Sequence, residues 1–184
     1  MNVRNLVTLG ACATVGALSV CSAFSKDLTT SGPMSTASKQ DIINTLRSKG
    51  NFHKMLSGLE QSYELDNELK GKGPYTVFAA DDKAWKKINQ ADQDTLFGNK
   101  KKIDEVLRYG VLKGQNLDSD QLYKMQGKEV QSLEGRLIKV GMTAGEKEQA
   151  FLWLNDSKVK TPDIRCRNGI IHIVDAPLMP PLKK

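Results

Sequence analysis

The stretch Asn168–Asp175, NGIIHIVD, decides the fold of this sequence. Its first two residues, Asn168–Gly169, are a strong two-residue signal for a β-hairpin, because both tolerate the positive φ angles of a type I′ turn. Val159–Cys166 supplies the strand before the turn, and a two-residue loop pairs Arg167 with Ile170. One face of the hairpin is then apolar, and the whole is expected to close a domain. The predicted apolar face consists of Ile164, Cys166, Ile171 and Ile173, and the opposite face of Asp163, Arg165, His172 and Val174.

The first 25 residues have the composition of an exported leader. One cation, Arg4, precedes the uncharged run Leu6–Phe24, which is the layout of a secretory signal peptide cut after Ser25. Two alternatives stay open: a lipid attached to Cys21, or an uncleaved leader that anchors the chain in a membrane. We expect a secreted or periplasmic protein, with Cys21 as the alternative anchor. The predicted segments are a signal peptide (1–25), a polar linker (26–37) and one folded domain (38–184).

The charge of the mature chain is moderately positive and spread along the sequence. Removal of the leader takes away only Arg4 of the 27 basic residues, so 26 basic residues face 21 acidic ones, a net charge of +5. Lys100–Lys102 is the one tight basic cluster, and we interpret it as a solvated helix end. In an exported domain this distribution argues against nucleic acid as the partner. Cys166 is the single cysteine beyond the leader, which excludes an intramolecular disulfide and favours a small core residue.

Helices are expected in the first half of the domain and strands in the second. Ser38 is placed to cap a first helix that ends at Gly50, and Asn51 is placed to cap a second. The β-branched and aromatic run Tyr75–Ala80 predicts a strand, and Asp81 caps the helix after it. This segregation predicts an α+β fold. The other expected elements are short helices within 91–107 and 118–122, and strands at 130–133, 137–140 and 151–154.

Three ordered motifs resemble those of the fasciclin-like domain family. Gly73–Trp85, GPYTVFAADDKAW, is similar to the family's first signature, Gly-Pro-aromatic-Thr-Val-Phe-Ala-Pro-Thr-Asp followed by a helix. Leu107–Gly114 resembles its central Leu-Tyr-His-Val-Val-Pro-Gly segment. Asn168–Pro180 resembles its closing Asn-Gly-Val-Ile-His-Val-Ile-Asp segment and the proline after it. Order and spacing agree over 38–181, nearly the whole mature chain.

The resemblance also implies site residues. Asp163 and Ile164 match an Asp-Ile motif that is a proposed receptor contact in related domains, and Tyr109 matches the Tyr of a Tyr-His pair implicated in adhesion. Two positions depart from the pattern: Ala80 replaces a Pro, and Gly110 replaces the His of that pair. The partner-binding residues that the resemblance implies are therefore Asp163, Ile164 and Tyr109.

The protein that the resemblance implies is a β-sandwich or wedge flanked by N-terminal helices. It acts in adhesion, binding a cell-surface or matrix protein or a polysaccharide, and it has neither catalytic activity nor a cofactor. The alternative is an envelope protein that carries a lipid, sugar or pigment between its helices and its sheet. An apolar pocket of several hundred Å³ would favour that alternative.

The residues themselves give no catalytic constellation. His53 and His172 are the only two histidines, and a Cys166–His172 dyad fails because the predicted hairpin places the two side chains on opposite faces. A structural zinc site needs about four Cys or His ligands, more than the mature chain offers. No phosphate-binding or serine-hydrolase motif is present in the sequence. We therefore expect a structural, hydrogen-bonded His172 and a surface His53.

Overall fold

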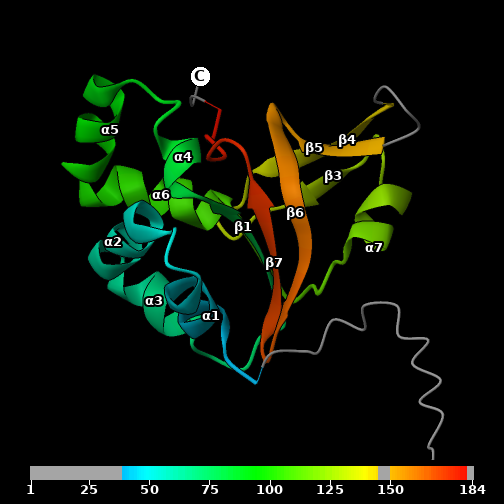
Figure 1. Ribbon diagram of the computed structural model, residues 1–184, viewed down its shortest axis with the longest axis horizontal. Coiled ribbons are helices and arrows are strands. Elements are labelled where there is room, and N and C mark those ends of the chain that lie inside the picture. Colours follow the sequence, from blue (N-terminus) through cyan, green and yellow to red (C-terminus); the bar gives the residue numbers. More distant parts are fainter. Residues whose placement is uncertain (1–38, 145–149, 182–184) are drawn as a thin grey trace, which may run out of the picture. The chain divides into compact units, whose positions relative to one another are not determined.

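The computed structural model describes residues 39–144 and 150–181, so Ser38, the predicted leader and the predicted linker lie outside the described residues. A seven-stranded mixed sheet has the order β2-β1-β7-β6-β5-β4-β3, with α1–α6 gathered on one side of β1 and β7, and with α7 next to β4 and β5 (Figure 1). The predicted α+β class is confirmed. The helices are α1 (Ile42–Lys49), α2 (His53–Gln61), α3 (Tyr63–Leu69), α4 (Asp82–Trp85), α5 (Gln90–Phe97), α6 (Lys100–Tyr109) and α7 (Ser119–Lys124). The strands are β1 (Tyr75–Ala80), β2 (Val111–Lys113), β3 (Glu129–Gln131), β4 (Leu137–Ala144), β5 (Ala150–Leu154), β6 (Ser157–Cys166) and β7 (Gly169–Val174).

Two strands that are distant in the sequence, β1 and β7, lie side by side within the sheet. They run parallel, with Tyr75 opposite Gly169 and Ala80 opposite Val174, and every residue of both strands is buried. Parallel strands that are covered on both faces require nearly continuous apolar runs, which explains the sequences YTVFAA and GIIHIV. On β7, the face that carries His172 and Val174 is therefore buried like the predicted apolar face, and His172 is fully buried.

The register of the closing hairpin differs from the prediction. Cys166 pairs with Gly169, so the turn is Arg167–Asn168, one residue earlier than expected. The predicted pairing of Cys166 with Ile171 is wrong, and Ile171 instead lies opposite Ile164. Because the pairing next to the turn moves by two residues, Ile164, Cys166 and Ile171 keep their predicted face. Cys166 is buried, as predicted.

The turn moves because Asn168 is used for tertiary hydrogen bonds. Its side-chain oxygen accepts from the N–H of Ile42 at 3.0 Å, and its amide nitrogen donates to the carbonyls of Leu69 at 2.7 Å and Gly71 at 2.9 Å. Asn168 is 5% exposed, so each of these bonds satisfies a polar group that has little access to water. The hairpin turn thereby joins the beginning of α1 to the end of α3.

Two predicted helix starts are wrong. Asp41, rather than Ser38, caps α1, with its carboxylate accepting from the N–H of Asn44. Asn51 does not cap α2; the carboxylate of Asp82, from α4, accepts from the N–H of Lys54 at 2.9 Å. A cap supplied from another helix leaves no local sequence signal. The predicted roles of Gly50, which ends α1, and Asp81, which caps α4, are confirmed.

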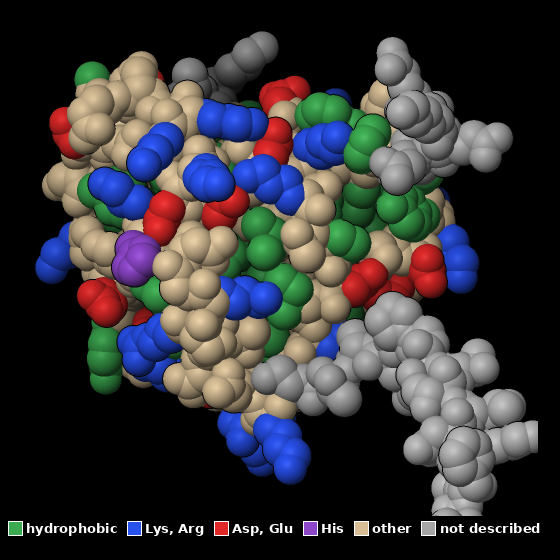
Figure 2. Space-filling model, viewed as in Figure 1, with side chains coloured by type: hydrophobic (Ala, Val, Ile, Leu, Met, Phe, Trp, Pro, Cys, Tyr) green, Lys and Arg blue, Asp and Glu red, His purple; other side chains and the backbone are tan. Residues whose placement is uncertain are grey.

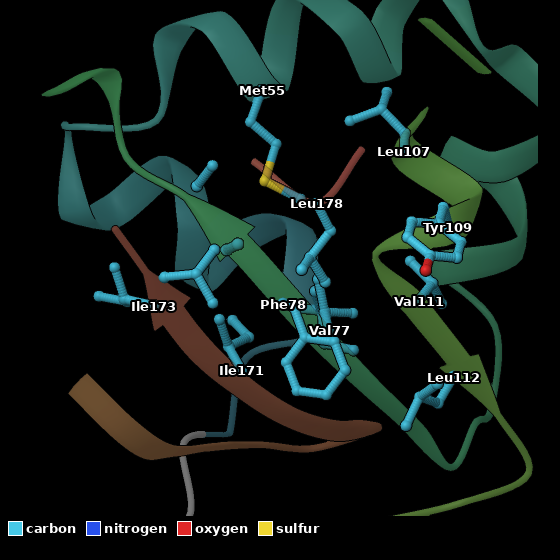
Figure 3. Packing of buried hydrophobic residues seen from close by; sticks show 14 of the residues in the cluster. Met55, Val77, Phe78, Leu107, Tyr109, Val111, Leu112, Ile171, Ile173 and Leu178 are labelled. Atoms are coloured by element: carbon cyan, nitrogen blue, oxygen red, sulfur yellow. The ribbon is translucent and has the colours of Figure 1, made fainter. Parts of the chain in front are cut away.

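The core lies between the helices and the central strands. Figure 3 shows Val77 and Phe78 of β1 beside Ile171 of β7, with Leu178 from the C-terminal segment reaching the same cluster. The N–H of Leu133, after β3, donates to the carbonyl of Val111 in β2 at 2.7 Å, so the two end strands of the sheet come together. Among the described residues, none of the helices has the length and apolar character needed to cross a membrane.

Candidate interaction site

Asp163 lies in a bulge of β6, where the pairing with β7 shifts between Thr161 and Ile164. Its φ angle of 60° is left-handed, a conformation that Asp tolerates better than most residues. The carboxylate accepts hydrogen bonds from the N–H of Ser119, at 2.8 Å, and from the Ser119 hydroxyl. Since Ser119 is the first residue of α7, this carboxylate ties β6 to α7 while remaining half-buried.

Ile164 follows directly and is half-buried, opposite Ile171 and packed against the core. Pro162, two residues before Ile164, lines a small cavity of about 150 Å³ between α7, β5 and β6. The segment Pro162–Ile164 therefore offers a limited surface in the folded state. The other residues that line the cavity are Tyr123, Phe151, Leu152, Val159 and Lys160.

Tyr109 is separate from this segment and is fully buried at the end of α6 (Figure 3). Its hydroxyl donates to the carbonyl of Leu137 at 2.9 Å and accepts from the side-chain amide of Asn155 at 2.7 Å. Burial raises the pKa of the Tyr109 phenol. The side chain thus fixes the start of β4 and the turn between β5 and β6, and any contribution of Tyr109 to partner binding passes through those segments.

His172 is the interior neighbour of Asp163. Its Nε2 lies 2.8 Å from the carbonyl of Leu117, and its Nδ1 accepts from the N–H of Asp163 at 3.3 Å. Because a carbonyl only accepts, Nε2 carries the proton of the neutral ring. The ring is fully buried and stacks on Phe78, and this burial lowers the pKa of His172. The predicted structural role of His172 is confirmed.

The cluster around Asp163 includes residues that sequence reasoning missed. Ser119 and Leu117 contribute backbone atoms, and Thr76 of β1 accepts from the N–H of Leu117 at 2.9 Å. No residue type marks a backbone partner, so the only available signal was the short helix expected within 118–122.

Cys166 and His172 have separate hydrogen-bond partners. The Cys166 thiol lies 3.4 Å from the Thr45 hydroxyl, and burial raises its pKa, which disfavours the reactive thiolate. The two ring nitrogens of His172 are bound to backbone groups instead. Within residues 39–144 and 150–181, no cluster of His, Cys, Asp or Glu has the arrangement of a metal site.

His53 and Asp82 form a hydrogen-bonded pair at the surface. His53 has 78% of its side chain exposed, as predicted for a surface residue, and its Nδ1 lies 2.8 Å from the Asp82 carboxylate. Ser57 lines the same hollow, one helical turn further along α2. Among the described contacts, no hydrogen bond joins Ser57 to His53, and a nucleophile requires its base within reach. The pair serves instead to hold the Asp82 cap on α2.

A separate hollow has a more apolar lining. A groove of about 660 Å³ runs between α5, α6 and the C-terminal segment, and mostly apolar side chains line it. Charges of both signs stand at its rim, and Arg136 donates to the carbonyl of Pro181 at 2.7 Å. Neither histidine lines the groove. Its apolar lining includes Ile88, Leu96, Val106, Met179, Pro180 and Pro181.

Comparison of the sequence and the fold with known proteins identifies the family. The sequence matches the fasciclin domain family over residues 50–180. This chain belongs to the fasciclin domain family. The fold resembles that of a solved FAS1 domain pair from the insect cell adhesion molecule fasciclin I, with a TM-score of 0.68 and 20% identity over 78% of this chain and 52% of that one. The expected fasciclin-like fold, a wedge with flanking helices, is therefore confirmed.

Curated relatives of this fasciclin domain differ in kind. It is 26% identical over 166 residues to transforming growth factor-beta-induced protein ig-h3 of Sus scrofa, covering 88% of this chain and 22% of the relative, so it spans about a fifth of that protein. It is 27% identical over 157 residues to a heme ligase of Plasmodium falciparum, covering 77% of each. It is 30% identical over 151 residues to cell surface glycolipoprotein MPB83 of Mycobacterium bovis, covering 81% of this chain and 61% of the relative. Fasciclin domains thus occur in adhesion and cell-surface proteins.

The surface of this fasciclin domain is electrostatically mixed. On the face in Figure 2, Lys and Arg side chains are scattered with Asp and Glu among them, and hydrophobic side chains lie between them. Lys100–Lys102 begins α6 and is exposed, as expected for a solvated helix end. This face therefore offers charged and apolar contacts in small areas.

Proposed function

We propose that this fasciclin domain is an exported, non-catalytic adhesion module that contacts a cell-surface or matrix protein or a polysaccharide. The observation that carries the proposal is the match over residues 50–180 to a family that includes a cell adhesion molecule and a cell surface protein. Export depends on the leader at 1–25, followed by the linker at 26–37. A lipid on Cys21 is the alternative attachment, and the mycobacterial relative is itself named a glycolipoprotein.

The contact we propose is the segment around Asp163 and Ile164 at the bulge of β6, where a carboxylate and an aliphatic side chain are neighbours and both are half-buried. An anionic group beside an apolar one suits a partner that carries a cation next to an apolar patch. Tyr109 takes part indirectly, because its hydroxyl fixes the turns at Leu137 and Asn155.

Replacing Asp163 by Asn tests this contact. Asn tolerates the left-handed backbone and still accepts from Ser119, so the fold survives while the charge is lost. We expect attachment of the purified domain to sister cells to weaken about tenfold, the loss of one charge-assisted hydrogen bond.

The matched control is Ser119→Ala, which removes the hydroxyl bonded to Asp163 and leaves the carboxylate in place. It should attach at least as strongly as the wild type, because the carboxylate keeps its charge. Equal attachment of wild type and Asp163→Asn, with unchanged circular dichroism, would eliminate this segment as the contact.

A second candidate function is favoured by one observation, the apolar groove of about 660 Å³, which lies within the size range of small-ligand sites. In this alternative the domain carries a lipid, sugar or pigment in the envelope; the heme ligase among the relatives supports it. Native mass spectrometry of the protein purified from its own envelope should then show added mass. The variant Thr95→Arg places a long cation in the groove and should lose that mass, whereas Tyr63→Arg, at an exposed position of α3, should keep it. The bare polypeptide mass in the wild type would refute the carrier.

A further inference from the structure

The interior histidine and the proposed contact segment share one hydrogen-bond network. His172 on β7 accepts from the backbone of Asp163 on β6, and the carboxylate of Asp163 holds Ser119 at the start of α7. The other ring nitrogen of His172 donates to Leu117, in the segment that leads into α7. The His172 imidazole is therefore hydrogen-bonded both to the bulge of β6 and to the segment that leads into α7.

This network is complete only while His172 is neutral. Nε2–H donates to Leu117, and Nδ1 offers its lone pair to the N–H of Asp163. A second proton can bind only at Nδ1, and the imidazolium then points a donor at the N–H of Asp163. Two facing donors repel each other, and a buried N–H left without an acceptor is costly. The bond to Asp163 must break for the proton to enter.

The groups around the ring determine whether the neutral or the protonated form of His172 is favoured. From β6, the Asp163 carboxylate faces the ring, and from the segment before α7 the Asp118 carboxylate does, with Arg165 4.0 Å from Asp118. From β1, the neighbour is the uncharged Phe78. The two carboxylates favour the cation, whereas burial opposes it, so protonation requires the site to open toward water.

We propose that acid opens this domain locally: protonation of His172 releases the β6 bulge and α7 and exposes Asp163 and Ile164, so that the contact under Proposed function, on which this inference rests, is regulated by pH. The helices α2 and α6, on the opposite side of β7, do not share the network and stay closed. Ile164 then gains the exposure that its half-buried position denies it in the neutral form.

The sign of the effect follows from linkage. The ordinary His pKa is 6.5, and burial lowers it in the closed form, so the open form binds the proton more tightly. The stability of the closed form relative to the open form is therefore greatest above pH 6.5 and decreases as the pH falls below that value. With an open-form pKa near that ordinary value, the opening constant should rise between pH 7.5 and 5.5, and the ceiling on this rise is about tenfold.

Hydrogen exchange of the full mature chain, without a partner, tests the release. After correction for intrinsic exchange, protection in α7, residues 115–118 and the β6 bulge should fall by up to about tenfold between pH 7.5 and 5.5, with α2 and α6 unchanged. His172→Gln should abolish this pH dependence, whereas His53→Gln, which alters the only other histidine, should keep it. Unchanged α7 protection, or an equal loss in all peptides, would overturn the proposal.

If His172→Gln does not fold, the wild-type and His53→Gln measurements still decide the question. Attachment to sister cells at the two pH values is a separate reading. Local release without any attachment would refute adhesion at this segment and leave the acid opening intact. Attachment without local release would refute the acid opening and leave adhesion intact.

Discussion

Replacing Gly169 by Ala should abolish folding or cost about 4 kcal/mol or more, at the extreme of single substitutions. A Cβ at this position would lie 2.0 Å from the carbonyl oxygen of Tyr75 and 2.9 Å from its carbonyl carbon, and Ile42 approaches within 3.0 Å. The obstructing atoms are backbone atoms of β1, so β7 would have to move away from its parallel partner. That movement breaks the pairing of two fully buried strands. Urea unfolding monitored by circular dichroism measures the loss.

Gly141→Ala is the matched control, because it is a strand glycine with room for a methyl group. Its Cβ would meet only the Cβ of Trp153, at an ordinary 3.8 Å. Restricting the unfolded chain should then leave stability unchanged or raise it by about 0.5 kcal/mol. A folded Gly169→Ala protein as stable as Gly141→Ala would show that β1 and β7 are not as closely apposed as described here.

The second large effect is expected for Asn168→Ala. Its side chain satisfies three backbone groups, the N–H of Ile42 and the carbonyls of Leu69 and Gly71. Ala leaves these groups without partners in a buried place, and each such group costs about 1–3 kcal/mol. The sum of about 3–9 kcal/mol is comparable to the whole stability of an ordinary domain. Denaturant midpoints and the exchange of α1 amides should both show the loss.

Asn89→Ala separates this effect from the ordinary loss of a helix cap. Asn89 is exposed and caps α5 by accepting from the N–H of Asp92 at 2.8 Å. Its removal should cost about 1 kcal/mol. If Asn168→Ala were no more destabilising than Asn89→Ala, the turn would not be the tertiary link between α1 and α3 that its contacts indicate.

Local signals in the sequence were enough for the elements that local chemistry determines. The apolar runs at Tyr75–Ala80 and Gly169–Val174 became buried strands, Gly50 ended a helix in a left-handed conformation, and Asp81 capped one. The family resemblance was confirmed for the same reason, since its motifs are these runs and their neighbours.

Residues whose partners come from distant parts of the chain could not be predicted. The Asn-Gly pair predicted the wrong turn because three backbone groups from other elements bind Asn168. Asn51 lost its capping role to Asp82, from a helix about thirty positions later. The link from Asp163 to Ser119 and His172 depends on a bulge that no pattern marked. At the site, Asp163, Ile164 and Tyr109 could be named in advance, but their burial and their partners Ser119 and Leu117 could not.

The order in which the strands pair has a consequence for biosynthesis. The strand at 75–80 finds its parallel neighbour only in residues 169–174, close to the C-terminal end of the chain. A nascent polypeptide that has not yet produced those residues has nothing to cover that side of β1, and distant pairings of this kind form late. The sheet therefore cannot be completed before residues 169–174 have been synthesised, and until then the apolar side chains of β1 lack the strand that covers them.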